Sequence, residues 1–240
     1  MLALRTQEVA HPGGARRSGF TAGLPGGSLD DLFLASVRRS AAAREIIVCE
    51  GDPSDSVFEV AEGVVKLYKL TPDGRRQVTG FVYPGQLFGL SRQGACIYTA
   101  EAITPVSVVL YPRTKLDQLA ARVPGLAQRL LSLATRELIT AQEQMLLLGR
   151  KTAVEKIASF LVAQAADAVA RGGDGGSLYL PMTRADIGDY LGLTTETVSR
   201  VFKPLKEHGI LSLRQQKYVV IHDHATLIDL ANGNLDGFEY

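Results

Sequence analysis

Glu196, Ser199 and Arg200 carry side chains of the kinds with which proteins recognise the edges of DNA bases. An arginine can donate two hydrogen bonds to guanine O6 and N7, a glutamate can accept one from the amino group of cytosine, and a serine can reach a base or a phosphate. On a helix, this spacing puts all three on one face. The alternative is a Glu196–Arg200 surface salt bridge, worth a few tenths of a kcal/mol, and the neighbouring sequence must decide.

The stretch from Thr183 to Arg200 predicts two short helices joined by a tight turn. Thr183 and Asp186 are spaced as a capping box, in which a hydroxyl and a carboxylate satisfy backbone N–H groups at a helix start. Gly188 is predicted where a side chain would hold the helices apart, and Gly192 in the turn, where a positive φ is often required. The small core between the helices is predicted from Ile187, Leu191, Leu193 and Val198. Such a helix-turn-helix places its second helix in the DNA major groove.

The sequence that follows adds a wing to this motif. Thr194 or Thr195 can cap the second helix, and Gly209 is predicted just beyond its end. Residues 210–221 alternate like a β-hairpin, and a strand-like stretch at 177–180 precedes the motif. Pro204 removes a helix hydrogen bond and predicts a kink or change of register beyond the base-recognising residues. Strand, two helices and hairpin together make a winged helix-turn-helix, and Glu196, Ser199 and Arg200 are its predicted base contacts.

Positive charge gathers in the same segment. From residue 200 to residue 217 there are five basic side chains and one acidic side chain, Glu207, in a chain whose net charge is +1. Basic side chains release the counterions condensed on DNA, so a local strip of this kind fits phosphate contact. The residues predicted to contact the DNA backbone are Thr183, Thr195, Thr197, Lys203, Arg214 and Lys217.

Composition excludes several other classes. The 240 residues suffice for one large or two modest domains, and the 46% hydrophobic content suffices for packed cores. No run approaches the roughly 18 apolar residues of a membrane helix, and no signal segment opens the chain, so we expect a cytoplasmic protein with no membrane contact. Two cysteines, Cys49 and Cys96, cannot form a disulfide framework or a four-thiolate cluster. We expect them to be structural or spare thiols, with redox sensing left open.

The remaining segments predict an α+β chain. Residues 1–27 are expected to form a disordered arm, because no apolar period appears there. Residues 28–113 are expected to form a sheet domain that opens with a helix over 29–40. Short alternating segments separated by Gly and Pro turns point to an antiparallel sandwich or roll. The predicted strands are 45–49, 56–60, 63–70, 77–82, 98–102 and 106–111.

A long helix is expected over 114–149. Its apolar positions are spaced 3, 4, 3, 4 and 3 residues apart, like the seam of a coiled coil. The alternative is a helix that packs against its own sheet. A protein that recognises a palindrome needs two copies, so we expect this seam to form a homodimer. The seam residues are Leu131, Ala134, Leu138, Ala141, Met145 and Leu148. The winged domain then covers 150–232, beginning with an amphipathic helix over 151–170, and residues 233–240 form a tail.

This layout of β-roll, long dimerisation helix and winged helix-turn-helix resembles the CRP/FNR family of bacterial transcription regulators, over roughly residues 28–230. Residues 50–52 and 84–89 look like the family's sheet turns, and residues 195–200 look like the recognition helix of its FNR side. The resemblance implies recognition of TTGA half-sites in an inverted repeat and RNA polymerase as a partner. Residues 180–182 with 186–200, and 88–90 with 100–103, are similar to the FixK subgroup, which controls low-oxygen respiration, denitrification and nitrogen fixation.

Two departures from the family concern its effectors. Its cyclic-AMP binders hold the ribose and the cyclic phosphate with a Gly-Glu pair and a later Arg-Ser or Arg-Thr pair. Here the first reads Phe88-Gly-Leu-Ser91, and Tyr98 stands in the arginine's place. Burying a phosphate without a cation is costly, and Arg92 is the cation that could substitute. The iron–sulfur cluster of FNR needs N-terminal cysteines, and the first 48 residues contain none.

We therefore expect a dimeric activator that needs no cofactor and binds DNA either constitutively or under the control of abundance, proteolysis or thiol oxidation. An alternative within the family is a regulator of denitrification that responds to haem or nitric oxide. Its axial ligand would be Cys49, Cys96 or His11, and an absorbance spectrum tests it. An enzyme is not expected, because no phosphate loop or nucleophile motif appears. The pair His222 and His224 is expected to face solvent rather than to bind a metal.

Overall fold

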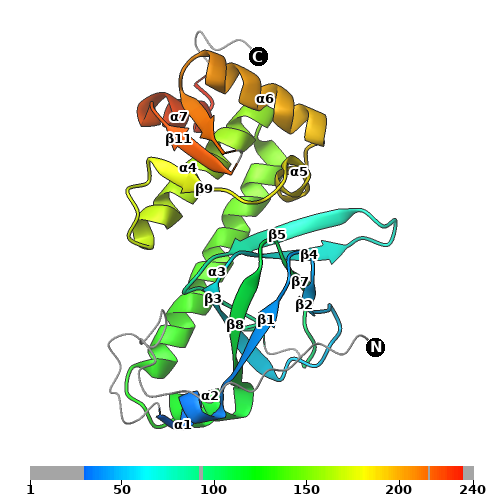
Figure 1. Cartoon of the computed structure of the whole chain (residues 1–240), viewed down its shortest axis with the longest axis vertical. Helices are drawn as coiled ribbons and strands as arrows, with labels where there is room; N and C mark the ends of the chain where they lie inside the picture. The colour runs from blue at the N-terminus through cyan, green and yellow to red at the C-terminus, as the bar shows by residue number, and fades with distance from the viewer. Residues whose placement is uncertain (1–29, 92–93, 216, 235–240) are drawn as a thin grey trace. The chain divides into compact units, whose positions relative to one another are not determined.

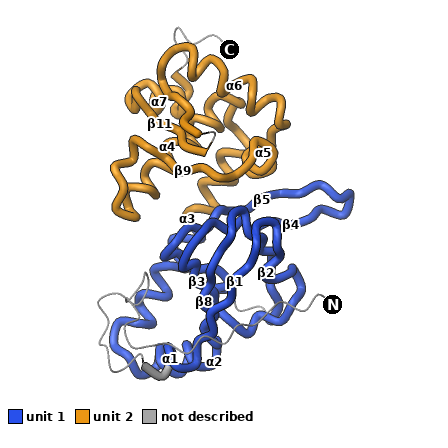
Figure 2. Tube along the Cα trace, in the orientation of Figure 1, with its two compact units in different colours: residues 1–138 blue, residues 139–240 orange. Residues whose placement is uncertain are grey.

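The computed structural model describes residues 30–91, 94–215 and 217–234. They belong to two compact units, residues 1–138 and residues 139–240, and the boundary falls inside the long helix α3 (Leu126–Arg150) (Figures 1 and 2). The predicted arm of residues 1–27 lies outside the described residues. So does the predicted tail, apart from residues 233 and 234.

Unit 1 is built on two antiparallel sheets of four strands each among its described residues. The first has the order β1-β8-β3-β6 and the second the order β2-β7-β4-β5. The strands are β1 (Val37–Ala41), β2 (Ile46–Val48), β3 (Ser56–Glu62), β4 (Val65–Leu70), β5 (Arg76–Val82), β6 (Leu87–Phe88), β7 (Thr99–Ala102) and β8 (Val106–Pro112). The β4–β5 hairpin extends beyond the rest of its sheet (Figure 1). This confirms the predicted β-roll.

Alternating side chains of the two sheets form one apolar core. Val60, Val65, Phe88 and Val108 are fully buried in it, and the Phe58 and Phe88 rings stack 4.8 Å apart. A strand of period two places every second side chain on the same face, which is why these short segments can share one interior. The six strands predicted from sequence all exist, with ends that differ by one or two residues.

The helix predicted over residues 29–40 is wrong in its second half. Helix α1 (Asp30–Ala35) ends early, and β1 then pairs with β8, with Val37 opposite Leu110 and Ala41 opposite Val106. Pairing with a strand about seventy positions later decides the structure of this segment, so its local apolar spacing misled the prediction. The two-residue strand β6 was also not predicted.

A second apolar cluster lies beside the sheets. Helix α2 (Arg113–Ala120) contributes Leu116 and Leu119, and α3 contributes Leu126, which packs with Leu32 and Tyr111. Within the segment predicted as one long helix, α2 and α3 are separate. The break coincides with Pro124, which lacks a backbone donor, and with Gly125 at a φ of 83°.

Unit 2 combines helices with a three-stranded antiparallel sheet of order β10-β11-β9. After the last residues of α3, its elements are α4 (Ala153–Ala170), β9 (Ser177–Tyr179), α5 (Arg184–Leu191), α6 (Thr195–Glu207), β10 (Leu211–Arg214), β11 (Tyr218–Ile221) and α7 (His224–Ala231). The strand, helix, helix and hairpin order confirms the predicted winged helix-turn-helix. Helix α7 was not predicted. Asp223 caps its start, and the helix packs on α4.

Candidate DNA-binding surface

The start of α5 is fixed by the predicted capping box. The Thr183 hydroxyl accepts a hydrogen bond from the Asp186 backbone N–H at 3.1 Å and donates to Asp186 Oδ2 at 2.7 Å. The same carboxylate accepts from the Thr183 backbone N–H at 3.0 Å. Asp186 is buried, so these bonds replace the water that its charge would otherwise hold. A cap of this kind contributes about 1 kcal/mol to the stability of a helix.

Two glycines set the spacing of the helix pair. A Cβ added to Gly188 would lie 2.6 Å from the backbone oxygen of Leu193, so only glycine lets α5 approach the turn this closely. Gly192 ends α5 with a φ of 63°, which side chains rarely tolerate. The next residue, Leu193, donates a hydrogen bond from its backbone N–H to the Gly188 carbonyl at 3.0 Å. Both glycines therefore have the roles predicted for them.

Helix α6 buries one face and exposes the other. The Thr194 side chain caps the helix by accepting from the Thr197 backbone N–H at 3.2 Å. The buried positions, at a helical spacing, are Val198, Val201, Phe202 and Leu205. Because this face is held in the core, the opposite face must carry Glu196, Ser199 and Arg200, and all three are exposed. The structure brings the predicted base contacts together on one accessible surface.

Glu196 is suited to accept hydrogen bonds. A hydrogen bond from its own backbone N–H, together with one from the Thr194 hydroxyl, lowers the pKa of its carboxyl group. The side chain is therefore a carboxylate at neutral pH, the form that accepts from an amino group. Pro204 lies inside α6, which continues to Glu207, so the proline does not end the helix.

The predicted phosphate contacts occupy two kinds of position. Thr195, Lys203, Arg214 and Lys217 are exposed, on α6 and around the wing turn. The hydroxyl of Thr197 lies 3.1 Å from that of Thr194, and the Thr183 hydroxyl already serves the capping box.

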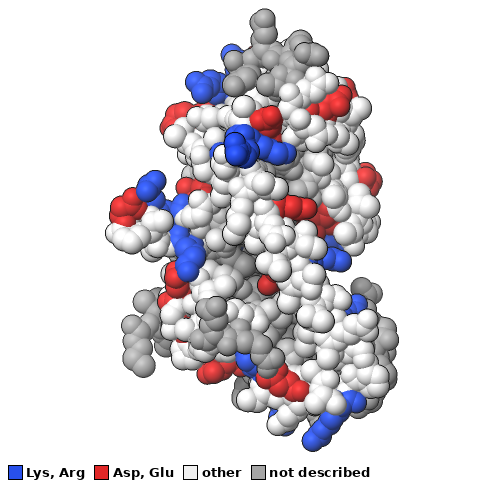
Figure 3. All heavy atoms as spheres, turned by 180° about the vertical axis from the view of Figure 1, so that it is seen from behind, with Lys and Arg blue, Asp and Glu red and all other residues white. Residues whose placement is uncertain are grey.

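Lys203 has a competing partner, because its Nζ lies 3.8 Å from Glu207. Lysine, arginine and carboxylate side chains intermingle on the face seen in Figure 3. That face is therefore not uniformly positive.

Arg184, at the first position of α5, was missed by the sequence analysis. Its guanidinium lies 3.4 Å from the centroid of the Phe202 ring, and burial lowers its pKa to about 10. Among the described residues, no carboxylate forms an ion pair with it. A half-buried cation beside the two helices of the motif is placed to meet an anion. The signal available in the sequence was its position next to the Thr183 cap, at the start of the first helix of the motif.

The predicted seam of α3 is apolar and largely exposed. Leu131, Leu138 and Met145 expose 67%, 60% and 71% of their surface, and the intervening Ala134 and Ala141 are exposed too. Leu148 differs, because it is half-buried and its Cδ2 would lie 3.4 Å from a Cβ on Gly192. Five of the six seam residues thus offer an uncovered stripe.

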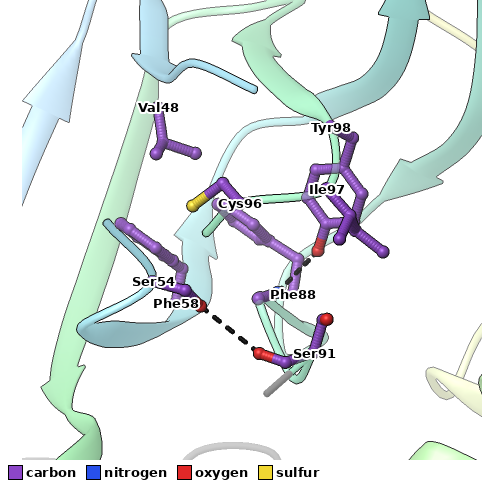
Figure 4. A pocket seen from close by; sticks show the side chains of 9 residues that line it. Val48, Ser54, Phe58, Phe88, Ser91, Cys96, Ile97 and Tyr98 are labelled. Carbon is purple, nitrogen blue, oxygen red and sulfur yellow. Dashed lines mark hydrogen bonds between the residues drawn. The ribbon is translucent and has the colours of Figure 1, made fainter. Parts of the chain in front are cut away.

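A small cavity in unit 1 has a mostly apolar lining that includes Phe58, Phe88, Ile97 and Tyr98 (Figure 4). The Tyr98 hydroxyl accepts a hydrogen bond from the Gly89 backbone N–H at 2.6 Å, and burial raises the pKa of Tyr98. Ser54 Oγ donates to the Ser91 carbonyl at 3.3 Å. The Arg113 guanidinium bonds to the Ser54 carbonyl at 2.9 Å and to the Gly89 carbonyl. The Gly89 amide and the Arg113 guanidinium are therefore already bonded within unit 1. Arg92, the cation predicted to substitute in a cyclic-nucleotide site, lies outside the described residues.

The fold and the surface of α6 define the class of this protein: a DNA-binding regulator in which a winged helix-turn-helix follows a β-roll along the chain. Two family models match the chain. The Crp-like helix-turn-helix domain covers residues 155–230, and the cyclic nucleotide-binding domain covers residues 38–123. Within the described residues, every helix is too short or too polar to span a lipid bilayer.

The chain belongs to the CRP/FNR family of transcription regulators. It is 41% identical to the nitrogen fixation regulation protein FixK of Bradyrhizobium diazoefficiens, over 78% of this chain and 76% of the relative. It is 42% identical to the transcriptional activator protein anr of Pseudomonas aeruginosa, over 88% and 86%. The solved structure of FixK2 from Bradyrhizobium japonicum superposes with a TM-score of 0.76 at 41% identity, covering 81% of this chain and 96% of that one. The names of the two relatives describe a regulator of nitrogen fixation and an activator of transcription.

Proposed function

We propose that this protein is a homodimeric transcription activator that binds inverted repeats of TTGA half-sites through α6. The exposed row of Glu196, Ser199 and Arg200, held outward by a buried opposite face, carries the proposal. Arg200 would donate to a guanine, Glu196 would accept from a cytosine, and Ser199 would contact a base or a phosphate. The residues proposed to hold the backbone are Thr183, Thr195, Thr197, Lys203, Arg214 and Lys217, joined by Arg184.

The names of the relatives support the choice of target genes. FixK regulates nitrogen fixation, and anr is an activator of transcription. We infer that this protein activates genes for low-oxygen respiration, denitrification or nitrogen fixation, acting with RNA polymerase on chromosomal DNA in the cytoplasm. It would do so without a cyclic nucleotide, because Tyr98 stands in place of the binders' arginine and bonds to the Gly89 amide. It would also do so without an iron–sulfur cluster of the FNR kind, because the first 48 residues contain no cysteine.

A gel-shift titration with an inverted TTGA repeat tests base recognition. Loss of a bidentate contact costs about 1–3 kcal/mol, so Arg200→Ala should weaken binding roughly 5- to 150-fold for each half-site, and the full repeat loses two such contacts. The variant should also discriminate less between the repeat and a duplex with the paired guanine replaced. Arg122→Ala, which removes an exposed arginine from unit 1, is the matched control and should bind as the parent does. Equal binding by Arg200→Ala and the parent would contradict the proposal.

Sedimentation equilibrium tests the dimer. The exposed stripe of α3 would bury Leu138 against a second copy, and a charge placed there would be desolvated without a partner. Leu138→Glu should sediment as a monomer and bind the full repeat no more tightly than a single half-site. Thr140→Glu adds the same charge to the same helix away from the stripe and should remain dimeric. A parent chain that is monomeric at micromolar concentration would refute this part of the proposal.

A further inference from the structure

One face of the wing sheet carries an exposed row of three side chains. Arg214 of β10 pairs with Tyr218 of β11, and Tyr218 pairs in turn with Tyr179 of β9. Directly opposed residues in neighbouring strands point to the same side of a sheet. Arg214 and the two tyrosines therefore face the same side of the sheet and form a row across all three strands. The row lies next to the turn between β10 and β11, which contains Lys217.

The two tyrosines are exposed although they are large. Tyr179 exposes 37% of its surface and Tyr218 exposes 39%, with ring centroids 5.1 Å apart. The opposite face of the sheet explains the orientation, since Leu178, Val219 and Ile221 point into the core of unit 2 and are buried. An isolated exposed ring is ordinary on a protein surface, but here two rings adjoin each other, and Arg214 is opposite one of them in the neighbouring strand.

The charges on this face indicate what kind of molecule could bind to it. The other residues that alternate onto it within the strands are Ser177, Ser212 and Val220, so no acidic side chain belongs to it. Among the described residues, no carboxylate pairs with Arg214 or Lys217. Tyrosines offer an apolar ring that packs on a sugar and a hydroxyl that donates to a phosphate. Cations, rings and hydroxyls without acids suit a polyanion with sugar faces.

We propose that the row of Arg214, Tyr218 and Tyr179 binds the sugar–phosphate backbone of the DNA that flanks the half-site recognised by α6. This rests on the proposed function, because it takes Arg214 to lie at a phosphate. Strands are spaced about 4.8 Å apart, so Tyr179 lies about 10 Å beyond Arg214. One strand of DNA rises about 3.4 Å per nucleotide, so the row adds roughly three base pairs to the outer edge of each half-site. These contacts are independent of sequence and lengthen the footprint.

A comparison of two duplexes tests the row. The short duplex ends at the outer edge of each TTGA half-site, and the long duplex continues for about six base pairs of arbitrary sequence on both sides. The parent should bind the long duplex about five- to tenfold more tightly, as expected for two or more added hydrogen bonds. The double variant Tyr179→Ala with Tyr218→Ala should lose most of this gain and bind the short duplex as the parent does.

Two further variants separate the contribution of the tyrosine hydroxyls from that of the rings and control for the loss of an exposed apolar side chain. Tyr179→Phe with Tyr218→Phe keeps the rings and removes the hydroxyls, so it should retain part of the gain. Ile228→Ala removes an exposed apolar side chain from α7 and should change neither affinity. Unaltered binding to the short duplex also demonstrates that the double alanine variant is folded.

Three outcomes would overturn this inference: equal losses on both duplexes, no loss on the long duplex, or weaker transcription with DNA affinity unchanged. The last would assign the face to a protein partner. Failure of the proposed function is distinguishable, because the parent would then not prefer the TTGA repeat to a scrambled duplex at either length.

Discussion

On α6, the side chains of Glu196, Ser199 and Arg200 are exposed, whereas the polar groups around the cavity of unit 1 bond to one another. In the cavity, the Tyr98 hydroxyl satisfies the Gly89 amide, and Arg113 satisfies two carbonyls. Both regions are built by the same device, a buried apolar layer that fixes the backbone. They differ in whether their hydrogen-bonding groups face water, as on α6, or bond within the protein, as around the cavity.

This difference bears on which region can bind an external ligand at the lower cost. Hydrogen-bonding groups that face water can exchange it for a base or a phosphate at little cost, while a group already bonded inside a protein must first lose that bond. The exposed side chains of α6 can therefore take an external ligand at little cost, whereas a ligand in the cavity of unit 1 would have to replace existing hydrogen bonds. Four substitutions can break or sharpen this comparison.

The largest effect is expected at Gly188, where the shape of the binding surface depends on backbone contact. In Gly188→Ala, the new Cβ would lie 2.6 Å from the Leu193 carbonyl oxygen, and the two helices must move apart. Overpacking of this kind costs about 1–3 kcal/mol, a drop in melting temperature of roughly 5–15 °C for a domain of this size. DNA binding should fall as well.

Gly149→Ala makes the same change in α3, where a Cβ would meet nothing within 4 Å. Alanine is the better helix former by about 1 kcal/mol, so this control should be neutral or stabilising in thermal melts. Equal melting of the two variants would show that the close approach of α5 and the turn is not required.

The next effect is expected at the cavity. Tyr98→Phe keeps the ring and removes the hydroxyl, leaving the Gly89 N–H without its acceptor. An unsatisfied, partly buried donor costs about 1–2 kcal/mol, measurable as a lower midpoint in urea. Tyr218→Phe removes an exposed hydroxyl and should leave the midpoint unchanged. An unchanged midpoint for Tyr98→Phe would mean that the cavity is not held closed by its own bonds.

A smaller effect is expected at the cap of α5. Thr183→Ala removes the acceptor of the Asp186 N–H and the donor to its carboxylate, which should cost about 1 kcal/mol. Thr183→Ser keeps both bonds and should restore most of the stability. Hydrogen exchange of the first amides of α5 is the direct measurement. Faster exchange in both variants would argue against the hydroxyl as the cause.

The smallest effect is expected at Glu207, an exposed residue 3.8 Å from Lys203. Exposed pairs of this type contribute at most about 0.5 kcal/mol, so Glu207→Gln should leave stability nearly unchanged. It frees Lys203 for a phosphate and should raise DNA affinity about twofold at low salt, with the gain lost at high salt. A decrease in affinity would show that Lys203 does not face the DNA.

Local signals made the recognition motif predictable. Thr183, Gly188 and Gly192 act on neighbours within a few positions, so their roles could be inferred from spacing alone. Strand β1 could not be inferred, because its structure depends on β8 far along the chain. Arg184 was not predicted for a similar reason, because its contact is with Phe202, which lies on the next helix. The DNA contacts remain predictions, because they depend on a partner.

The uncovered leucines of α3 also make the number of copies in the cell a physical variable. If two chains must meet along Leu131, Leu138 and Met145 before a palindrome can be bound, operator occupancy at low abundance rises with the square of subunit concentration. A twofold change in synthesis or degradation would then change promoter occupancy about fourfold. Turnover of the protein could in this way carry a signal that no bound effector supplies.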